Sequence, residues 1–176
     1  NDVPSVRRAA LVEQGSVMIN RRREPLATVR QLIDVAQEAA AAGEDFMAAR
    51  AWGNAAHAAM GLLPLDERVH AFEQMLAAAE RAGWMPEGQL SYVQGRFDIA
   101  LYAGDRAEAD RWMVGHDDLD VSRPAGLTDW ADMNQALLAL ESGDTETASR
   151  TLDRIGTVSR EKVEMLAAVR LAVAVV

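Results

Sequence analysis

A few side chains in this 176-residue chain have the types and spacing that metal chemistry requires. His70 and Glu73 lie three residues apart, so one helix could offer an imidazole and a carboxylate to the same ion. Carboxylate metal bundles need several such pairs on facing helices, and the sequence holds no second pair. The segment 116–120 gathers oxygen ligands but lacks the glycine and distal glutamate of a calcium loop. We therefore expect no metal site and no cofactor.

The motifs of nucleophilic and phosphate chemistry are missing. Neither Gly-x-Ser-x-Gly nor His-Glu-x-x-His occurs. The single lysine, Lys162, follows Glu161 rather than glycine, so there is no P-loop. With no cysteine, disulfides and a Cys-His nucleophile pair are excluded. We expect a protein that is not an enzyme, with an all-helical enzyme as the least favoured alternative.

Four tryptophans are spread along the chain and could form an aromatic cage for a cation. Their placement favours packing between helices instead, with Trp130 the one expected to face a groove. These residues are Trp52, Trp84, Trp112 and Trp130.

Charge and composition limit the partners. The formal net charge is -9 and the pI is near 4.8, which argues against direct contact with nucleic acid. No apolar run approaches the ~18 residues of a membrane span, and no signal peptide precedes the first helix. We expect a cytoplasmic protein. Because the chain begins with Asn1 and stops inside an apolar segment, we also expect a piece of a larger protein.

The elements that must position any site are helices. Hydrophobic residues make up 49% of the chain, many are alanine, and no alternating strand pattern occurs. The stretch 46–83 predicts two antiparallel helices joined at 61–65. The apolar residues expected to be buried there are Ala48, Ala51, Trp52, Ala55, Ala56 and Ala59 in the first helix, and Val69, Phe72, Met75, Leu76 and Ala79 in the second.

Imperfect copies of this hairpin fill the chain. Helix pairs are predicted at about 4–43, 44–83, 86–114 and 127–156, with a polar loop between Gly115 and Gly126. The first helix is expected to use Val6, Ala10, Val17 and Met18 as apolar positions. Glycines terminate helices at Gly43 and Gly83, the connectors are Gly104-Asp105 and Gly143-Asp144, and Asp105 with Glu108 forms a capping-box pattern.

The apolar segment 159–176 predicts one more helix, without a partner to cover it. We expect it to be the first helix of a fifth pair and a surface for self-association. Helix pairs recurring about every forty residues predict an all-α fold, an α-solenoid formed by a single domain.

Two segments resemble the turn of the tetratricopeptide repeat: Gly104-Asp105-Arg106-Ala107-Glu108-Ala109 and Gly143-Asp144-Thr145-Glu146-Thr147-Ala148. Residues 52–59 resemble the opening of that repeat's first helix. Ala56 replaces the usual glycine, Ala59 the usual aromatic residue, and Arg68 stands where the repeat has a small residue. The longer period, with Ala-Ala-Gly-Glu at 41–44 and Arg-Ala-Gly-Trp at 81–84, is similar to the repeat region of large LuxR-type bacterial transcription regulators.

The resemblance implies that the first helices of successive pairs line a concave binding face. It assigns to that face Arg50, Asn54 and His57, then Gln94, Asp98 and Tyr102, then Trp130, Met133 and Asn134. Asn54 and Asn134 occupy equivalent positions, at which asparagine serves either to grip a peptide or as an ordinary scaffold residue. The implied function is a sensing or protein-interaction domain of a bacterial regulator, for a protein, peptide or small-molecule effector. The alternative is a stand-alone adaptor that holds an extended peptide in its groove.

Overall fold

The computed structural model describes residues 3–20, 25–117, 125–153 and 155. In these ranges the chain forms helices and short connectors, with no strand, which confirms the predicted all-α class. The helices are α1 (Val3–Asn20), α2 (Pro25–Ala41), α3 (Asp45–Ala58), α4 (Leu65–Arg81), α5 (Met85–Ala103), α6 (Arg106–Asp117), α7 (Ala125–Glu141) and α8 (Thr145–Asp153).

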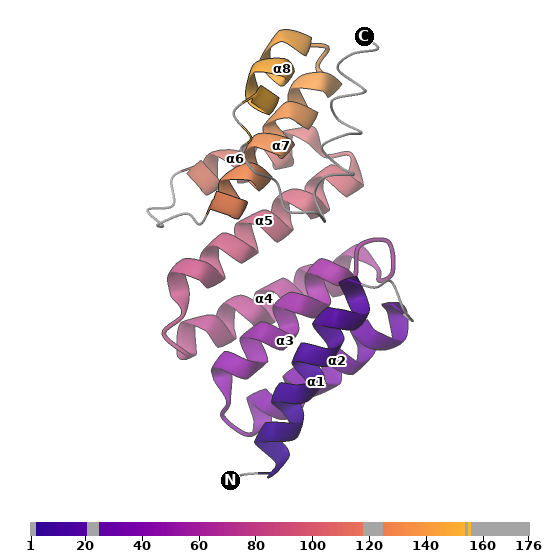
Figure 1. Cartoon of the computed structure of the whole chain (residues 1–176), viewed down its shortest axis with the longest axis vertical. Helices are drawn as coiled ribbons and strands as arrows, with labels where there is room; N and C mark the ends of the chain where they lie inside the picture. The colour runs from indigo at the N-terminus through magenta and orange to yellow at the C-terminus, as the bar shows by residue number, and fades with distance from the viewer. Residues whose placement is uncertain (1–2, 21–24, 118–124, 154, 156–176) are drawn as a thin grey trace. The chain divides into compact units, whose positions relative to one another are not determined.

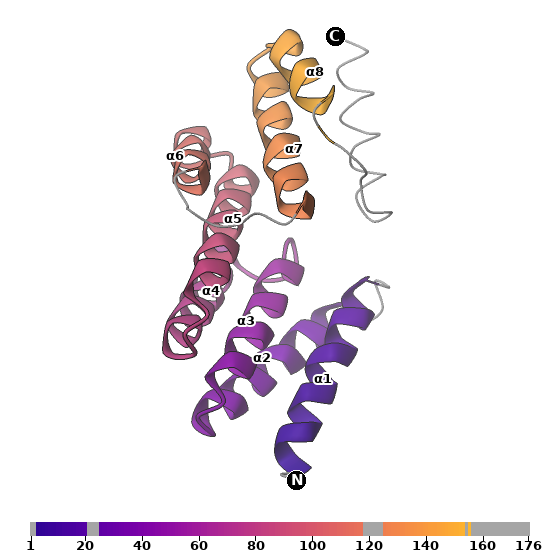
Figure 2. The same cartoon turned by 60° about the vertical axis from the view of Figure 1, so that its left-hand side comes forward.

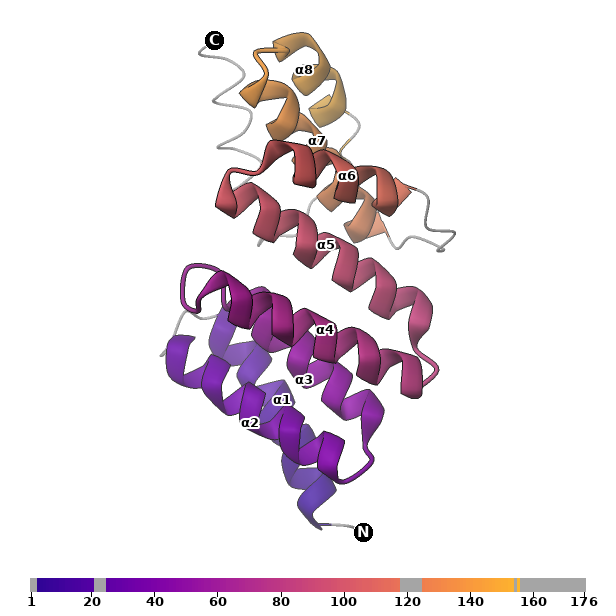
Figure 3. The same cartoon turned by 180° about the vertical axis from the view of Figure 1, so that it is seen from behind.

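Contacts divide the chain into two compact units, 1–121 and 122–176. In the first unit each helix packs on the next from α1 to α6, and α3 also contacts α1 and α5. The first helices α1 and α3 form one layer, towards the viewer in Figure 1, and α2 and α4 lie in front in the reverse view of Figure 3. Consecutive helices are paired, and successive first helices contact each other. This pattern of contacts is typical of a helical repeat.

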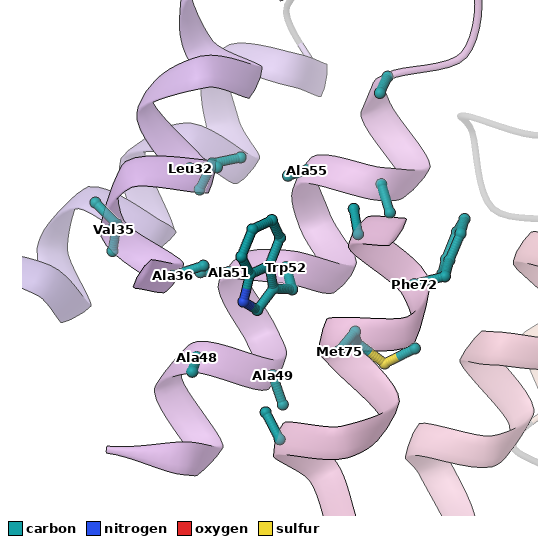
Figure 4. Packing of buried hydrophobic residues seen from close by; sticks show 14 of the residues in the cluster. Leu32, Val35, Ala36, Ala48, Ala49, Ala51, Trp52, Ala55, Phe72 and Met75 are labelled. Carbon is teal, nitrogen blue, oxygen red and sulfur yellow. The ribbon is translucent and has the colours of Figure 1, made fainter. Parts of the chain in front are cut away.

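The core of the first unit lies around α3. Its alanines at 48, 49, 51, 55 and 56 are fully buried, as are Ala59 just after it and Phe72 and Ala79 of α4. Small side chains let the helix axes approach closely. Trp52 fills the space between α2 and α4, with Leu32 and Ala36 on one side and Met75 on the other (Figure 4). This is the burial that the hairpin pattern predicted, except that Val69 and Leu76 are only partly buried.

Four helices end in the same way, at a glycine with φ between 70° and 76°. At the end of α2, Gly43 N–H donates to Ala40 O (3.1 Å) and Glu44 N–H to Ala39 O (2.9 Å). This pair of bonds satisfies carbonyls that the helix leaves free. The same arrangement closes α4, α5 and α7 at Gly83, Gly104 and Gly143, which confirms the predicted ends and connectors.

The predicted capping box at the start of α6 is half formed. Glu108 N–H donates to Asp105 Oδ1 at 3.0 Å, as expected. The Glu108 carboxylate does not reach back to Asp105; it accepts from Trp112 Nε1 at 2.6 Å and from Arg111. Asp144 caps α8 in the same way, accepting from Thr147 N–H at 2.9 Å, and this bond is the first cause of its lowered pKa.

Two glycines bring α5 against α4. A Cβ on Gly88 would lie 2.6 Å from Ala79 Cβ, and one on Gly95 would lie 2.1 Å from Phe72 Cζ. These distances are too short for any side chain, so glycine permits the approach. The contact fixes which turn of α5 faces which turn of α4.

The apolar positions expected in α1 do not form its buried side. Val6, Ala10 and Val17 are exposed and Met18 is partly buried, whereas the buried positions are Arg8, Val12 and Gly15. A Cβ at Gly15 would lie 2.8 Å from Leu32 Cδ2, so the missing side chain leaves room for α2. Arg8 is buried because its Nε donates to Glu44 Oε2 at 2.8 Å and its Nη2 pairs with the other oxygen; this partner lowers the pKa of Glu44.

The expected loop between Gly115 and Gly126 was too long at both ends. Helix α6 continues through Gly115 to Asp117, and α7 already begins at Ala125. One glycine in a helix costs only about 1 kcal/mol, so Gly115 does not end α6. The described residues do not include 118–124 or the predicted helix 159–176. Self-association through that helix therefore stays a prediction.

The second unit contains the pair α7 and α8, seen side by side in Figure 2. Its small core lies on the facing sides of the two helices. The buried residues are Met133, Ala136, Ala139, Ala148, Leu152 and Ile155.

Candidate functional site

Polar side chains of α3 connect the first helices of the first unit. Arg50 Nη2 pairs with Glu13 Oε1 of α1 at 2.6 Å, and Asn54 Nδ2 donates to Ser16 Oγ of α1 at 2.8 Å. On the other side, His57 Nε2 lies 3.0 Å from Ser91 Oγ of α5.

These three predicted site residues therefore lie where α3 contacts the other first helices, Arg50 and Asn54 against α1 and His57 against α5. Each already has a partner within the protein, and His57 is the most exposed of them. They help to hold the first helices together, whatever else they bind.

The three predicted residues of α5 differ in exposure. Gln94 is buried, with 7% of its surface exposed, and its Nε2 has no hydrogen-bond partner among the described residues. Asp98, one turn later, is partly buried. Tyr102 is 58% exposed, and its hydroxyl lies beside the connector at Gly61, 3.7 Å from where a Cβ would stand.

Arg68 of α4 completes this region, and the sequence analysis did not assign it to a site. Its side chain is fully buried, Nε donates to Ala56 O at 3.3 Å, and Nη1 and Nη2 have no partner among the described residues. A signal was present: Arg68 begins the stripe 68, 72, 75, 79, which is otherwise apolar and faces the core. We name His57, Arg68, Gln94, Asp98 and Tyr102 the Arg68 cluster.

Electrostatics connect the members of the cluster. Burial raises the pKa of Asp98 to about 7, and the charge of Arg68 opposes that rise. Burial lowers the pKa of Arg68, against the pull of Asp98 and Tyr102. Desolvation by the surrounding helices, and then the charge of Arg68, lower the pKa of His57; water at its exposed edge limits this shift. At pH 7 the cluster thus holds a buried cation, a neutral imidazole and a carboxyl that is close to half protonated.

The predicted residues of the fourth pair belong to the second unit. Met133 is fully buried in the core of that unit, not at a groove, and Asn134 is 5% exposed. The side chain of Trp130 lies outside the described residues. A binding role for Asn134 and Trp130 remains a prediction.

The tryptophans expected to pack between helices do contact other aromatic rings. Trp52, Trp84 and Trp112 each pack edge-on against a different ring, those of His70, Phe46 and Tyr92, at 5.3–6.2 Å between centroids. No cage is formed by these three. Within the described residues, no three His, Cys, Asp or Glu side chains come close enough to hold a metal ion.

One surface pocket of about 320 Å³ lies between α2, α3 and α4, next to Trp52 and His70. Its cation Arg30 already pairs with Glu67 at 2.8 Å. A second pocket, of about 430 Å³, lies where α2 gives way to α3, and there Arg81 pairs with Asp45 at 2.8 Å. Among the described residues, buried side-chain nitrogens without a hydrogen-bond partner occur in the Arg68 cluster, at Arg68 Nη1 and Nη2 and Gln94 Nε2, and also at Arg96 Nε.

The chain matches no protein-family model, no curated protein and no solved structure. No helix in the described ranges is long and apolar enough to cross a membrane. The fold and the residues of the Arg68 cluster are therefore the basis for a functional proposal.

Proposed function

We propose that this chain is a non-catalytic binding module whose ligand or partner is held at the first helices α3 and α5, next to Arg68 of α4. The observation that carries the proposal is the Arg68 cluster, because buried donors without partners seldom persist unless something else satisfies them. The tetratricopeptide-like pattern supports the same face, because helical repeats use an extended concave surface for binding.

By its resemblance to the repeat regions of LuxR-type regulators, the module acts as the sensing or interaction domain of a cytoplasmic bacterial transcription regulator. Binding between first helices suits that role, because a ligand that contacts both α3 and α5 favours one spacing of these helices over others. A stand-alone adaptor for an extended peptide would use the same face.

Two histidines allow a matched test. His57 lies in the cluster, edge-on to Phe72 at 4.9 Å, and His70 is an exposed histidine edge-on to Trp52 at 6.2 Å. The wild-type chain and the variants His57→Ala and His70→Ala are purified under mild conditions and their bound molecules identified by native mass spectrometry. We expect a bound molecule on the wild type and on His70→Ala, and its loss from His57→Ala. Equal retention by both variants would contradict a site at this face.

A further inference from the structure

The Arg68 cluster has an excess of buried hydrogen-bond donors. Arg68 Nη1 and Nη2 and Gln94 Nε2 have no partner among the described residues, and both side chains are more than nine-tenths buried. Asp98 is only about half ionised at pH 7, so it offsets the charge of Arg68 in part, and buried donors without acceptors are costly. The missing component is therefore an acceptor.

The packing of α4 on α5 places these donors in neighbouring turns. Gly95 faces Phe72, which follows Arg68 by one turn of α4. Asp98, one turn after Gln94, lies in the electrostatic field of Arg68. Asp98 thus lies near the guanidinium, and Gln94 lies one turn before Asp98 on α5.

We propose that the Arg68 cluster binds the carboxylate group of a small ligand, which Arg68 holds with Nη1 and Nη2 while Gln94 donates a third hydrogen bond. The inference rests on the proposed binding function and names the chemistry of its ligand. A guanidinium offers two parallel N–H groups that match the two oxygens of a carboxylate.

A monoanion fits the charge of this place better than phosphate. Arg68 is the single cation of the cluster, Asp98 contributes negative charge when it is ionised, and the chain carries a net charge of -9. A dianion would require a more basic surrounding.

Asp98 makes the binding depend on pH. Ionised Asp98 repels a bound carboxylate, whereas the protonated form is neutral and adds a donor. The other groups here are Arg68 of α4, His57 of α3, which is neutral, and Tyr102 of α5 itself. Burial raises the pKa of Asp98, and the charge of Arg68 opposes that rise. The ligand therefore binds together with a proton on Asp98.

Access is from the side of α5 on which Tyr102 lies. Tyr102 is exposed and Asp98 is partly buried, whereas Arg68 and Gln94 are buried. Tyr102 interacts electrostatically with Arg68, and an exposed side chain changes rotamer within nanoseconds, so we infer that movement of the Tyr102 ring gives a ligand access to the guanidinium.

Acetate is the probe, because it carries the carboxylate alone and is ionised at both pH 6 and pH 8. The side-chain N–H signals of Arg68 and Gln94 are followed by NMR during titration with sodium acetate, with sodium chloride at the same ionic strength as the reference. We expect saturable shifts with acetate only. Affinity at pH 6 should be about tenfold higher than at pH 8, because the protonated fraction of Asp98 changes by that factor.

Three variants decide the outcome. Arg68→Met keeps the length of the side chain and should abolish saturation, and Asp98→Asn should remove the dependence on pH. Arg81→Met changes an exposed arginine of the same helix and should leave acetate binding intact. Saturation that persists in Arg68→Met, or shifts of equal size with chloride, would overturn the proposal.

The result is separable from that of the histidine test. If acetate does not bind but His57→Ala still loses its co-purified molecule, the face binds a ligand without a carboxylate at Arg68. If acetate binds and no molecule co-purifies, the donor site stands and the ligand is not retained during purification. The same titration with a longer carboxylic acid, and with a peptide ending in aspartate, then distinguishes a free acid from a protein segment.

Discussion

Asp98 and His57 respond to pH in opposite directions. The folded pKa of Asp98, about 7, lies above its ordinary value of 3.8, so the native carboxyl keeps a proton that the unfolded chain releases between these values. Its contribution to stability is complete below pH 3.8 and is lost as the pH rises through 7. The pKa of His57 is lowered, so its contribution is present above 6.5 and is lost as the pH falls.

Asp98→Asn isolates the first effect, because asparagine stays neutral. Relative to the wild type, the variant should gain unfolding free energy between pH 4 and pH 8, by on the order of 3 kcal/mol at most given the partial exposure of Asp98. Urea unfolding at each pH measures the difference. Asp66→Asn removes an exposed aspartate of α4 as the control. Parallel pH profiles for the wild type and Asp98→Asn would show that the carboxyl is not desolvated in the folded chain.

The burial of single residues could be predicted where they belong to an apolar stripe of a helix. The alanines of α3 follow one helical stripe, and all of those predicted to be buried are buried. Of the site residues, Arg50, Asn54 and His57 meet neighbouring first helices as that face requires. The burial of Arg68 was not predicted, because a charged side chain is seldom buried. Only the fold shows that it is fully buried and donates to Ala56 O.

Gly95 allows α5 to pack closely on Phe72 of α4. Gly95→Ala places a methyl group about where the ring of Phe72 lies. Overpacking costs about 1 to 3 kcal/mol and the gain in helix propensity returns up to about 1, so the variant should lose about 1 to 2 kcal/mol of unfolding free energy.

Gly115→Ala in α6 is the matched control, because no atom lies within 4 Å of its added Cβ. It should gain about 0.5 to 1 kcal/mol. Denaturant unfolding of both variants gives the comparison, and adding Phe72→Leu to Gly95→Ala should recover part of the loss. An unaffected Gly95→Ala would mean that α5 lies further from α4 than the structure has it.

Helices and their pairing could be read from the sequence because each boundary carries a local signal. Gly43, Gly83, Gly104 and Gly143 adopt the left-handed conformation that ends a helix, and these positions divide the described helices correctly. The buried face of α1 could not be read in this way. Its burial depends on Gly15 and on an ion pair with Glu44, thirty-six residues from Arg8, and neither belongs to an apolar stripe.

In the unit formed by 1–121, α3 is the helix on which the others depend. It contacts α1, α2, α4 and α5, whereas α6 packs chiefly on α5. In a repeat architecture each element is stabilised by its neighbours, so protection from hydrogen exchange should follow the number of neighbours. We expect the slowest amide exchange in α3 and faster exchange in α6.

Trp52→Ala tests this dependence, because Trp52 joins α3 to both α2 and α4 (Figure 4). Removing a buried tryptophan costs about 3 to 5 kcal/mol. Exchange measured by mass spectrometry should therefore quicken in α2, α3 and α4 more than in α6, which lies on the far side of α5. Val114→Ala, at a position of α6 that is 62% exposed, should leave exchange in α2 to α4 unchanged. If Trp52→Ala instead quickens exchange equally from α1 to α6, the unit unfolds all at once, and stability is shared by the whole molecule rather than transmitted from one helix pair to the next.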